Sequence, residues 1–492
     1  MRVWIGVYLP LIPLEALRPS WCEQGEYALI DNDRVLVTSA LAARSGVRCG
    51  MRRGGVSAIA PETTLLERDL VQEQRALDSV AMTLLQFTPE VTYAEGFAVL
   101  LDVTASQRLF GGCHLLCRRL SASIRALGFT ARLGTAPTAQ AAWLLARSKS
   151  DRSGPVRRRV MQMETMTRRL DRLPCSLLPA ADLHRDWLQG IGCQVLGDLR
   201  KLPRAGLQRR TNKDLLEAMD RAYGMAPELF EWIKAPPVFG ERLEMPDRIE
   251  HAEALLFGAQ RLVLQMVGWL VALQQAVSRF VLLLEHERGR AAVPPTAIEI
   301  ALAEPTWQEE HLIRLLKERL GRVELTAPVI AIRLSAETLS PMLPPTESLF
   351  PEPGGSPSDY KRLLELLVAR LGNDKVLAPI PVSDHRPETC NRWGPATTPC
   401  TKTDEDEDDE SADRPFWLLA KPIPLLLRDH RPFYGSPLKL IRGPERIEAG
   451  WWDDGLAVRD YFVAQGAEAA CYWVYRERTQ EEACWYLHGL FA

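Results

Sequence analysis

The sequence predicts an α+β protein built from several domains, and three patterns lead to this prediction. Residues 97–103 form an apolar run interrupted only by Asp102, and a helical pattern follows from about His114. Such a run is typical of a strand buried on both faces. Residues 239–336 alternate predicted strands and helices in the order β-α-β-β-α-β. Beyond residue 414, short aromatic-rich segments indicate a small β-rich module.

Length and composition are those of an ordinary soluble globular protein. The 492 residues correspond to roughly three or four domains. A net charge of −3 excludes a protein that is basic overall, yet residues 151–210 carry 13 Arg and Lys against 6 Asp and Glu. The acidic run DEDEDDE at 404–410 is expected to be a disordered spacer. Any affinity for nucleic acid is therefore expected to be local.

The cysteines and the N-terminus exclude further classes. The ten cysteines contain no CxxC pair, and Cys113 with Cys117 has no matching His or Cys pair downstream. We therefore expect no zinc or other metal site, no cofactor, and a reducing cytoplasmic location. The apolar N-terminus is interrupted by two prolines and is interpreted as a first strand, and no run of 18 apolar residues predicts a membrane span.

The first 150 residues alternate strands and helices. Strands are expected at 3–8, 27–30, 35–37, 97–103 and 131–136, and helices at 71–89, 113–127 and up to Ser148. Between them lies SALAARSGVRCGMRRGG, in which a helix ends at Gly46 and a Gly50-Met51 turn follows. Its arginines, Arg48, Arg52 and Arg53, either face a triphosphate or are solvated surface residues.

The central strand resembles the palm strand of Y-family, translesion DNA polymerases, through LDVTAS and the following RLFGG. In that family two acidic residues precede the Asp of LDVT by five and four positions, which here are Phe97 and Ala98. The first-strand metal-binding Asp falls on Gly6 when Glu15 is aligned with the family's Glu. Magnesium requires oxygen ligands, so the resemblance implies a palm without catalytic residues.

Two more family positions have changed. The phosphate-contacting Asn-Lys pair of a GIAxNKxLAK pattern falls here on Thr138 and Ala139, and the steric-gate aromatic falls on about Leu11. An alternative is an active polymerase with displaced carboxylates, for example Glu95 and Asp102. Its spacing supplies no partner carboxylate on the first strand.

Residues 187–204, WLQGIGCQVLGDLRKLPR, carry a helix-hairpin-helix signature. Gly190 and Gly192 let the backbone approach a phosphate, and the amides at the start of the next helix are expected to receive it. Nearby cations, expected to bind DNA without reading its sequence, are Lys201, Arg204, Arg209 and Arg210. A simple αα-hairpin is the alternative.

A Pro-, Gly- and Ser-rich segment follows the β-α-β-β-α-β region, which resembles the family's little finger. Within this segment lies a peptide that resembles the QLSLF-type motif by which bacterial polymerases bind the β sliding clamp: Thr346, Glu347, Ser348, Leu349 and Phe350. Two apolar anchors in an extended peptide suit a pocket. The alternatives are local packing of these side chains and a clamp contact through Leu490 and Phe491.

The expected domains are palm and fingers 1–150, thumb 151–236, little finger 237–336, linker 337–414 and C-terminal module 415–492. The whole chain resembles the catalytically inactive, Y-family-like subunit of a bacterial mutasome, through RLFGG, LFPE, DHRPE, RPFWL, GPERIEAGWW, RDYF and WYLHGLF. The resemblance implies a non-enzymatic adaptor in SOS-induced translesion synthesis and mutagenesis, associated with the nucleoid during DNA damage. The partners that it implies are DNA, the β sliding clamp, an error-prone DnaE-type polymerase alpha subunit and ImuA, a RecA-like accessory protein.

Overall fold

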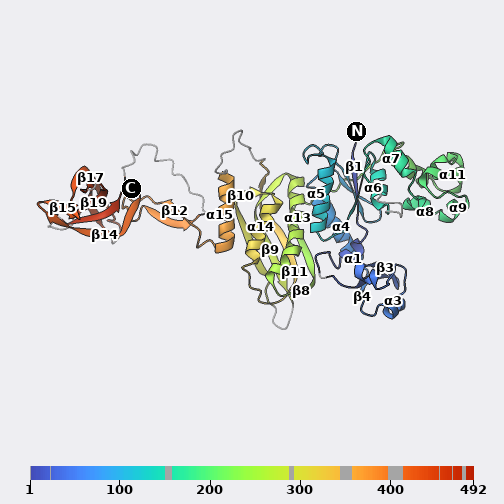
Figure 1. Cartoon of the computed structure of the whole chain (residues 1–492), viewed down its shortest axis with the longest axis horizontal. Coiled ribbons are helices and arrows are strands. Elements are labelled where there is room, and N and C mark those ends of the chain that lie inside the picture. Colours follow the sequence, from blue (N-terminus) through green and yellow to red (C-terminus); the bar gives the residue numbers. More distant parts are fainter. Residues whose placement is uncertain are drawn as a thin grey trace. The chain divides into compact units, whose positions relative to one another are not determined.

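The computed structural model describes residues 2–22, 24–149, 158–287, 293–343, 357–396, 414–453, 455–467, 469–478 and 484–491. The chain divides into two compact units, Met1–Arg362 and Leu363–Ala492. Each unit is described by itself, and Figure 1 labels its helices and strands. The 404–410 acidic run and the clamp-motif residues lie outside the described residues.

A four-stranded antiparallel sheet forms the centre of the first unit, in the order β5-β6-β1-β7. Its strands are β1 (Trp4–Tyr8), β5 (Val91–Ala94), β6 (Ala98–Asp102) and β7 (Arg132–Ala136). Every residue of β6 is buried, as the continuous apolar run predicts. The predicted central strand is therefore confirmed.

The two faces of this sheet support two different cores. Ile5, Val7, Val99 and Leu101 pack with helices α4 (Leu70–Leu84) and α5 (Cys113–Ala126). The alternate residues, among them Trp4, Ala98 and Leu100, pack with α6 (Ala139–Arg147) and the helices that follow it. Strand side chains alternate between faces, so residues two apart share a face of the sheet.

A small subdomain follows the first strand and a short helix, α1 (Ile12–Glu15). Its sheet has the order β3-β2-β4. Its elements are β2 (Tyr27–Asp31), β3 (Arg34–Thr38), α2 (Ala40–Arg44), α3 (Arg53–Ile59) and β4 (Thr64–Glu67). Asn32 and Asp33 both have positive φ, the conformation of a tight hairpin turn, and the Ser39 side chain accepts from the amide of Ala42 to cap α2.

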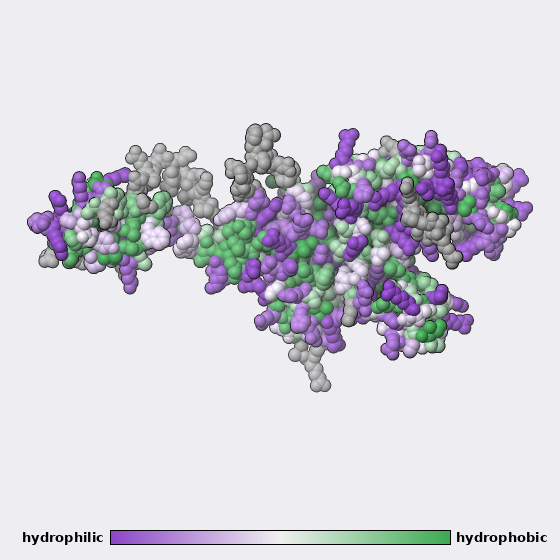
Figure 2. All heavy atoms as spheres, in the orientation of Figure 1, coloured by the Kyte–Doolittle hydropathy of each residue, from purple (hydrophilic) through white to green (hydrophobic). Residues whose placement is uncertain are grey.

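Short helices succeed α6 and share its core. They are α7 (Met163–Leu170), η1 (Cys175–Leu177), α8 (Pro179–Asp182), α9 (Arg185–Gly190), α10 (Leu196–Lys201), α11 (Arg204–Arg210) and α12 (Lys213–Ala222). Figure 2 shows mainly hydrophilic side chains over this end of the unit.

The next region has the predicted β-α-β-β-α-β order, and its antiparallel sheet has the strand order β10-β9-β11-β8. The elements are β8 (Gly240–Ile249), η2 (Ala252–Leu255), α13 (Leu256–Leu273), β9 (Gln275–His286), β10 (Thr296–Thr306), α14 (Glu309–Leu320) and β11 (Val329–Pro341). Helix α13 lies against α4, and a Cβ added to Gly268 would be 2.1 Å from the Met82 carbonyl oxygen. This segment, Ala252–Leu273, is long and apolar enough to span a membrane, but 72% of its apolar 18-residue window is buried inside the structure.

Helix α15 (Pro357–Leu371) and the hairpin β12 (Leu377–Pro381) and β13 (Asn391–Pro395) lie within the segment expected to be a linker, so this part of it is structured. A seven-stranded antiparallel sheet then confirms the β-rich C-terminal module, in the order β16-β15-β14-β20-β19-β18-β17. Its strands are β14 (Trp417–Arg428), β15 (Arg431–Tyr434), β16 (Ser436–Pro437), β17 (Lys439–Ala449), β18 (Ala457–Gln465), β19 (Cys471–Glu477) and β20 (Trp485–Leu490). Leu490 and Phe491 pack against the two cores of this sheet, not as a separate peptide.

The DHRPE motif joins the hairpin to this sheet. The Arg386 guanidinium donates to Asp384 and to Asp453, each at 2.7 Å, and to the Gly455 carbonyl oxygen at 3.0 Å. Glu388 accepts from Arg459 at 2.8 Å. The motif therefore forms a network of ion pairs inside the second unit.

Candidate functional site

The palm sheet places two of the three predicted acid positions on one face. Tyr8 pairs directly with Ala98, and Gly6 pairs with Leu100 on the same strand. Strand alternation therefore puts Gly6, Tyr8 and Ala98 on the face that α6 covers. Phe97 instead precedes β6 with a φ of 60°, and its ring packs against the core on the opposite face. The structure thus separates Phe97 from the other two positions.

Helix α6 lies directly on this face because two glycines leave room for its backbone. Gly6 and Gly134 are register partners on β1 and β7. A Cβ on Gly6 would be 2.7 Å from the carbonyl carbon and oxygen of Ala142, and one on Gly134 would be 2.3 Å from that oxygen. Real Cβ atoms do not approach backbone this closely. A carboxylate side chain at residue 6 therefore requires α6 to move.

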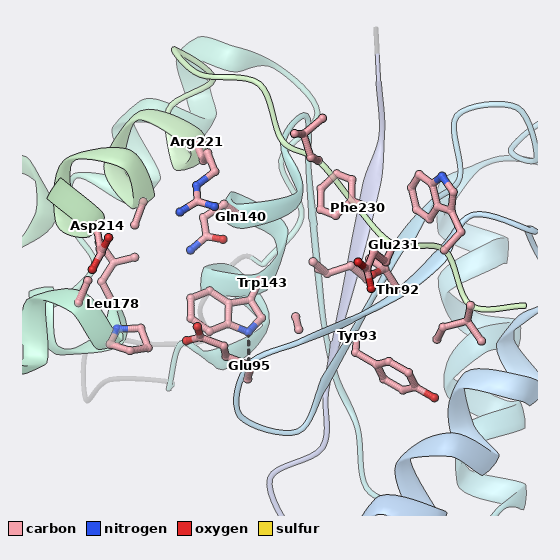
Figure 3. A pocket seen from close by; sticks show the side chains of 18 of the residues that line it. Thr92, Tyr93, Glu95, Gln140, Trp143, Leu178, Asp214, Arg221, Phe230 and Glu231 are labelled. Atoms are coloured by element: carbon pink, nitrogen blue, oxygen red, sulfur yellow. Dashed lines mark hydrogen bonds between the residues drawn. The ribbon is translucent and has the colours of Figure 1, made fainter.

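An aromatic and cationic stack lies where α6 ends. The indole N–H of Trp143 donates to the Glu95 carbonyl oxygen at 2.9 Å, a bond drawn in Figure 3. The Arg147 guanidinium carbon is 4.4 Å from the centroid of the Trp143 ring and 6.0 Å from that of Tyr8. A Cβ on Gly96, which lies in the turn before β6, would be 3.8 Å from the same carbon. A cation therefore lies beside Ala98, in a place that the sequence analysis missed; Trp143 and Arg147 at i and i+4 were its only local signal.

The other end of α6 is bound to a carboxylate of the same chain. Glu228 accepts from the amides of Ala139 and Gln140 at 2.9 and 2.8 Å, and Thr138 donates to the Ala222 carbonyl oxygen at 3.0 Å. Burial raises the pKa of Glu228, while the two amides act in the opposite direction. Because helix N-termini attract anions, this carboxylate occupies the position that a phosphate would take.

An active polymerase with displaced carboxylates would need Glu95 and Asp102 close together, and the structure holds them apart. Asp102 is buried at the end of β6, where its Oδ1 accepts from the amide of Thr104 at 2.9 Å, while exposed Glu95 precedes the strand. The four steps of β6 alone separate the two by roughly 13 Å. Among the residues that the structure describes, no group of three His, Cys, Asp or Glu side chains is arranged to hold a metal ion.

A large pocket of about 1130 Å³ opens beside this stack, between the palm and the short helices. Figure 3 shows Trp143, Tyr93 and Phe230 around it, with Arg221 and Asp214 on the α12 side. The chain that leaves the helices returns across β5, where the amide of Ile233 donates to the Val91 carbonyl oxygen at 2.8 Å. The lining is aromatic and carries charges of both signs, so the pocket is not a simple anion site.

Two short helices, α9 and α10, flank the glycines of the predicted helix-hairpin-helix, and both glycines are exposed. Gly190 ends α9 and Gly192 has a φ of 78°. The start of α10 differs from the expectation, because the amides of Leu196 and Gly197 donate to carbonyl oxygens at the end of α7, those of Leu173 and Asp171. These two amides are therefore not free to receive a phosphate.

The predicted thumb cations divide into two kinds. Lys201, Arg209 and Arg210 are exposed and form no ion pair within the described residues. Arg204 instead forms two bonds to Asp220, at 2.8 and 2.6 Å. An exposed pair of this kind exchanges readily with another anion. Three of the four residues can therefore bind a phosphate without first breaking an ion pair that the structure shows.

Arginines of the little-finger-like sheet are paired with glutamates of the same sheet. Arg279 is paired with Glu299 and Glu337 at 2.7 and 3.1 Å. Arg242 is likewise paired with Glu244 and Glu285. Within the described residues, the charges of Arg242 and Arg279 are therefore balanced by neighbouring carboxylates.

Comparison with known proteins agrees with this architecture. Residues 15–147 match the model of the impB/mucB/samB family, and this range lies within the predicted palm and fingers, 1–150. Protein ImuB of Caulobacter vibrioides, in the strains NA1000 / CB15N and ATCC 19089 / CIP 103742 / CB 15, is 25% identical over 471 residues, covering 91% of this chain and 100% of the relative. The chain is therefore similar to Protein ImuB over 91% of its length.

Solved structures also align with about two thirds of the chain. A Dbh ternary complex aligns with a TM-score of 0.39 and 17% identity, over 68% of this chain and 98% of that one. A Y-family DNA polymerase chimera of Dbh and Dpo4 aligns with a TM-score of 0.38 and 18% identity, over 69% and 99%. The residues matched by the family model include β5, β6, β7 and α6, while β1 precedes them.

Proposed function

We propose that this chain is a non-catalytic, Y-family polymerase-like adaptor in translesion synthesis and mutagenesis. The observation that supports this most directly is the contact of the α6 backbone with Gly6 and Gly134. It leaves no room for a carboxylate at residue 6 on the sheet face where the family resemblance places the metal ions. Similarity to Protein ImuB along 91% of the chain supports the same proposal.

The adaptor binds DNA through its thumb, without reading sequence. The exposed hairpin glycines Gly190 and Gly192 support this. So do Lys201, Arg209 and Arg210, which are exposed and form no ion pair within the described residues. Such contacts go to phosphates, which are the same in every sequence. Arg204 joins them by exchanging Asp220 for a phosphate.

The protein partners follow from the resemblance. The β sliding clamp binds the peptide of Thr346, Glu347, Ser348, Leu349 and Phe350, which lies outside the described residues between β11 and α15. An error-prone DnaE-type polymerase and ImuA assemble with the rest of the chain in the cytoplasm, at the nucleoid after SOS induction. Pull-downs with chains truncated at 337 and 414 assign each partner to a part of the chain.

Primer extension tests the absence of catalysis. The purified chain is incubated with a primed template, the four deoxynucleotides and magnesium or manganese, and binding to the same DNA is measured by fluorescence anisotropy. We expect DNA binding without extension above a no-protein control. Extension that is lost in Asp102→Asn or Glu95→Gln would instead establish the alternative, an active polymerase with displaced carboxylates.

A further inference from the structure

Arg132 and Arg147 adjoin Tyr8 at one end of the palm sheet, and Arg158 lies near Arg132. Arg132 is the direct register partner of Tyr8 on β7, so both side chains lie on the α6 face. Arg147 lies over the Tyr8 ring. Arg158 donates to the carbonyl oxygen of Ser148, the residue that follows Arg147, at 2.9 Å. The pKa of Arg158 is lowered by burial and by the nearby charge of Arg132. The like charges of Arg132 and Arg158 therefore lie close together, and Arg147 lies over the ring of the residue that pairs with Arg132.

Among the described residues, no carboxylate neutralises these arginines. Within the described residues none of the three forms an ion pair, and each side chain is only partly buried. Glu95, the acidic residue of the adjoining turn, offers its carbonyl oxygen to Trp143 and forms no ion pair with them. The paired arginines of the little-finger-like sheet, such as Arg279, show the contrast. Bringing like charges together costs free energy, which an anionic ligand would offset.

The arrangement suits one kind of anion. A guanidinium stacked on an aromatic ring keeps its N–H edge for a phosphate, and Arg147 is stacked on Trp143 with one N–H donating to the Leu177 carbonyl oxygen. Tyr8 and Trp143 add aromatic surface of the kind on which bases of a single strand stack. Guanidinium groups beside aromatic rings are the combination that binds a nucleic-acid strand.

We propose that this end of the palm sheet binds the phosphodiester backbone of a DNA strand, with Arg132, Arg147 and Arg158 as its phosphate-binding residues. A free nucleoside triphosphate fits less well, because Glu228 already occupies the amides at the start of α6. The palm would then hold DNA with protein cations at the place where the resemblance expects metal ions. This inference rests on the DNA-binding part of the proposed function.

The test is the salt dependence of DNA binding by the full chain. Anisotropy of a labelled single strand is measured between about 50 and 200 mM salt, where each lost phosphate contact lowers the slope of log K against log salt by about 0.7. For Arg132→Gln with Arg147→Gln we expect the slope to fall by about 1.4. The wild type then loses about sevenfold more affinity than the variant over this range. Arg279→Gln, which removes a paired arginine, is the matched control and keeps the wild-type slope.

Further variants separate the possible results. Arg147→Lys keeps the positive charge, so the slope of log K against log salt should equal that of the wild type. This variant can be measured even if the double variant unfolds at a lower temperature. A folded double variant with the wild-type slope overturns the inference, while the thumb contacts and the proposed function stand. Displacement of the strand by deoxynucleoside triphosphates, lost in the same variant, also overturns it in favour of a free nucleotide. A wild-type chain that binds no DNA removes the proposed function as well.

Discussion

Replacing Gly6 with alanine tests whether α6 lies on the palm sheet. The new Cβ would be 2.7 Å from the carbonyl carbon and oxygen of Ala142 and 2.9 Å from the amide nitrogen of Trp143. Ordinary contact begins at 3.4 Å, so the helix backbone must move by about 0.7 Å. Both helix residues are buried, so this movement disturbs a packed core.

The expected cost follows from these contacts. Overpacking of a core costs about 1–3 kcal/mol. Replacing a glycine within a strand by alanine stabilises the folded state by about 0.5–1 kcal/mol. A net loss of about 1–2 kcal/mol should lower the melting temperature by a few degrees, at about 2–4 °C per kcal/mol for domains of ordinary size. Gly134→Ala should cost more, because its Cβ would be 2.3 Å from the Ala142 oxygen.

Differential scanning calorimetry of the full chain measures the effect. Gly55→Ala is the control, since its Cβ in α3 meets nothing within 4 Å, and it should be neutral or stabilising. If Gly6→Ala melts at or above the wild-type temperature, α6 does not close this face. Gly6→Asp with Ala98→Glu should also give no metal-dependent incorporation, because a carboxylate enters only by displacing α6.

Three other predictions concern the thumb, the clamp peptide and the second unit. Changing Lys201, Arg204, Arg209 and Arg210 to Glu should weaken binding to all DNA sequences alike, and unchanged binding would show that the thumb does not contact DNA. Leu349→Ala with Phe350→Ala removes two side chains worth about 1.5–3 kcal/mol each, so clamp affinity measured by surface plasmon resonance should fall about 100-fold or more; undiminished affinity would place the contact elsewhere. Hydrogen bonds from Arg386 lower the pKa of Asp384 below its ordinary 3.8, so their contribution is complete above that pH and is lost on acidification. Arg386→Gln should therefore flatten the acid limb of the unfolding curve, and an unchanged limb would contradict this role.

Local sequence patterns predicted much of this fold. The 97–103 run predicted β6 because an apolar segment without alternation is stable only when both of its faces are covered. The β-α-β-β-α-β order of 239–336 was predicted in the same way, from alternating periods of two and 3.6 residues. The absence of acids at Gly6, Phe97 and Ala98 needs no structure, because side-chain chemistry is part of the sequence.

The contacts that define the candidate site were decided by the tertiary structure. Glu228 and Ala139 are 89 positions apart, yet they share a hydrogen bond. Arg147 lies over Tyr8 because the backbone of α6 packs closely against Gly6 and Gly134. Phe97 and Ala98 face opposite sides of the sheet because Phe97 has a positive φ immediately before β6. Local periodicity carries no information about such pairings, since they arise from strand register and helix packing between distant segments.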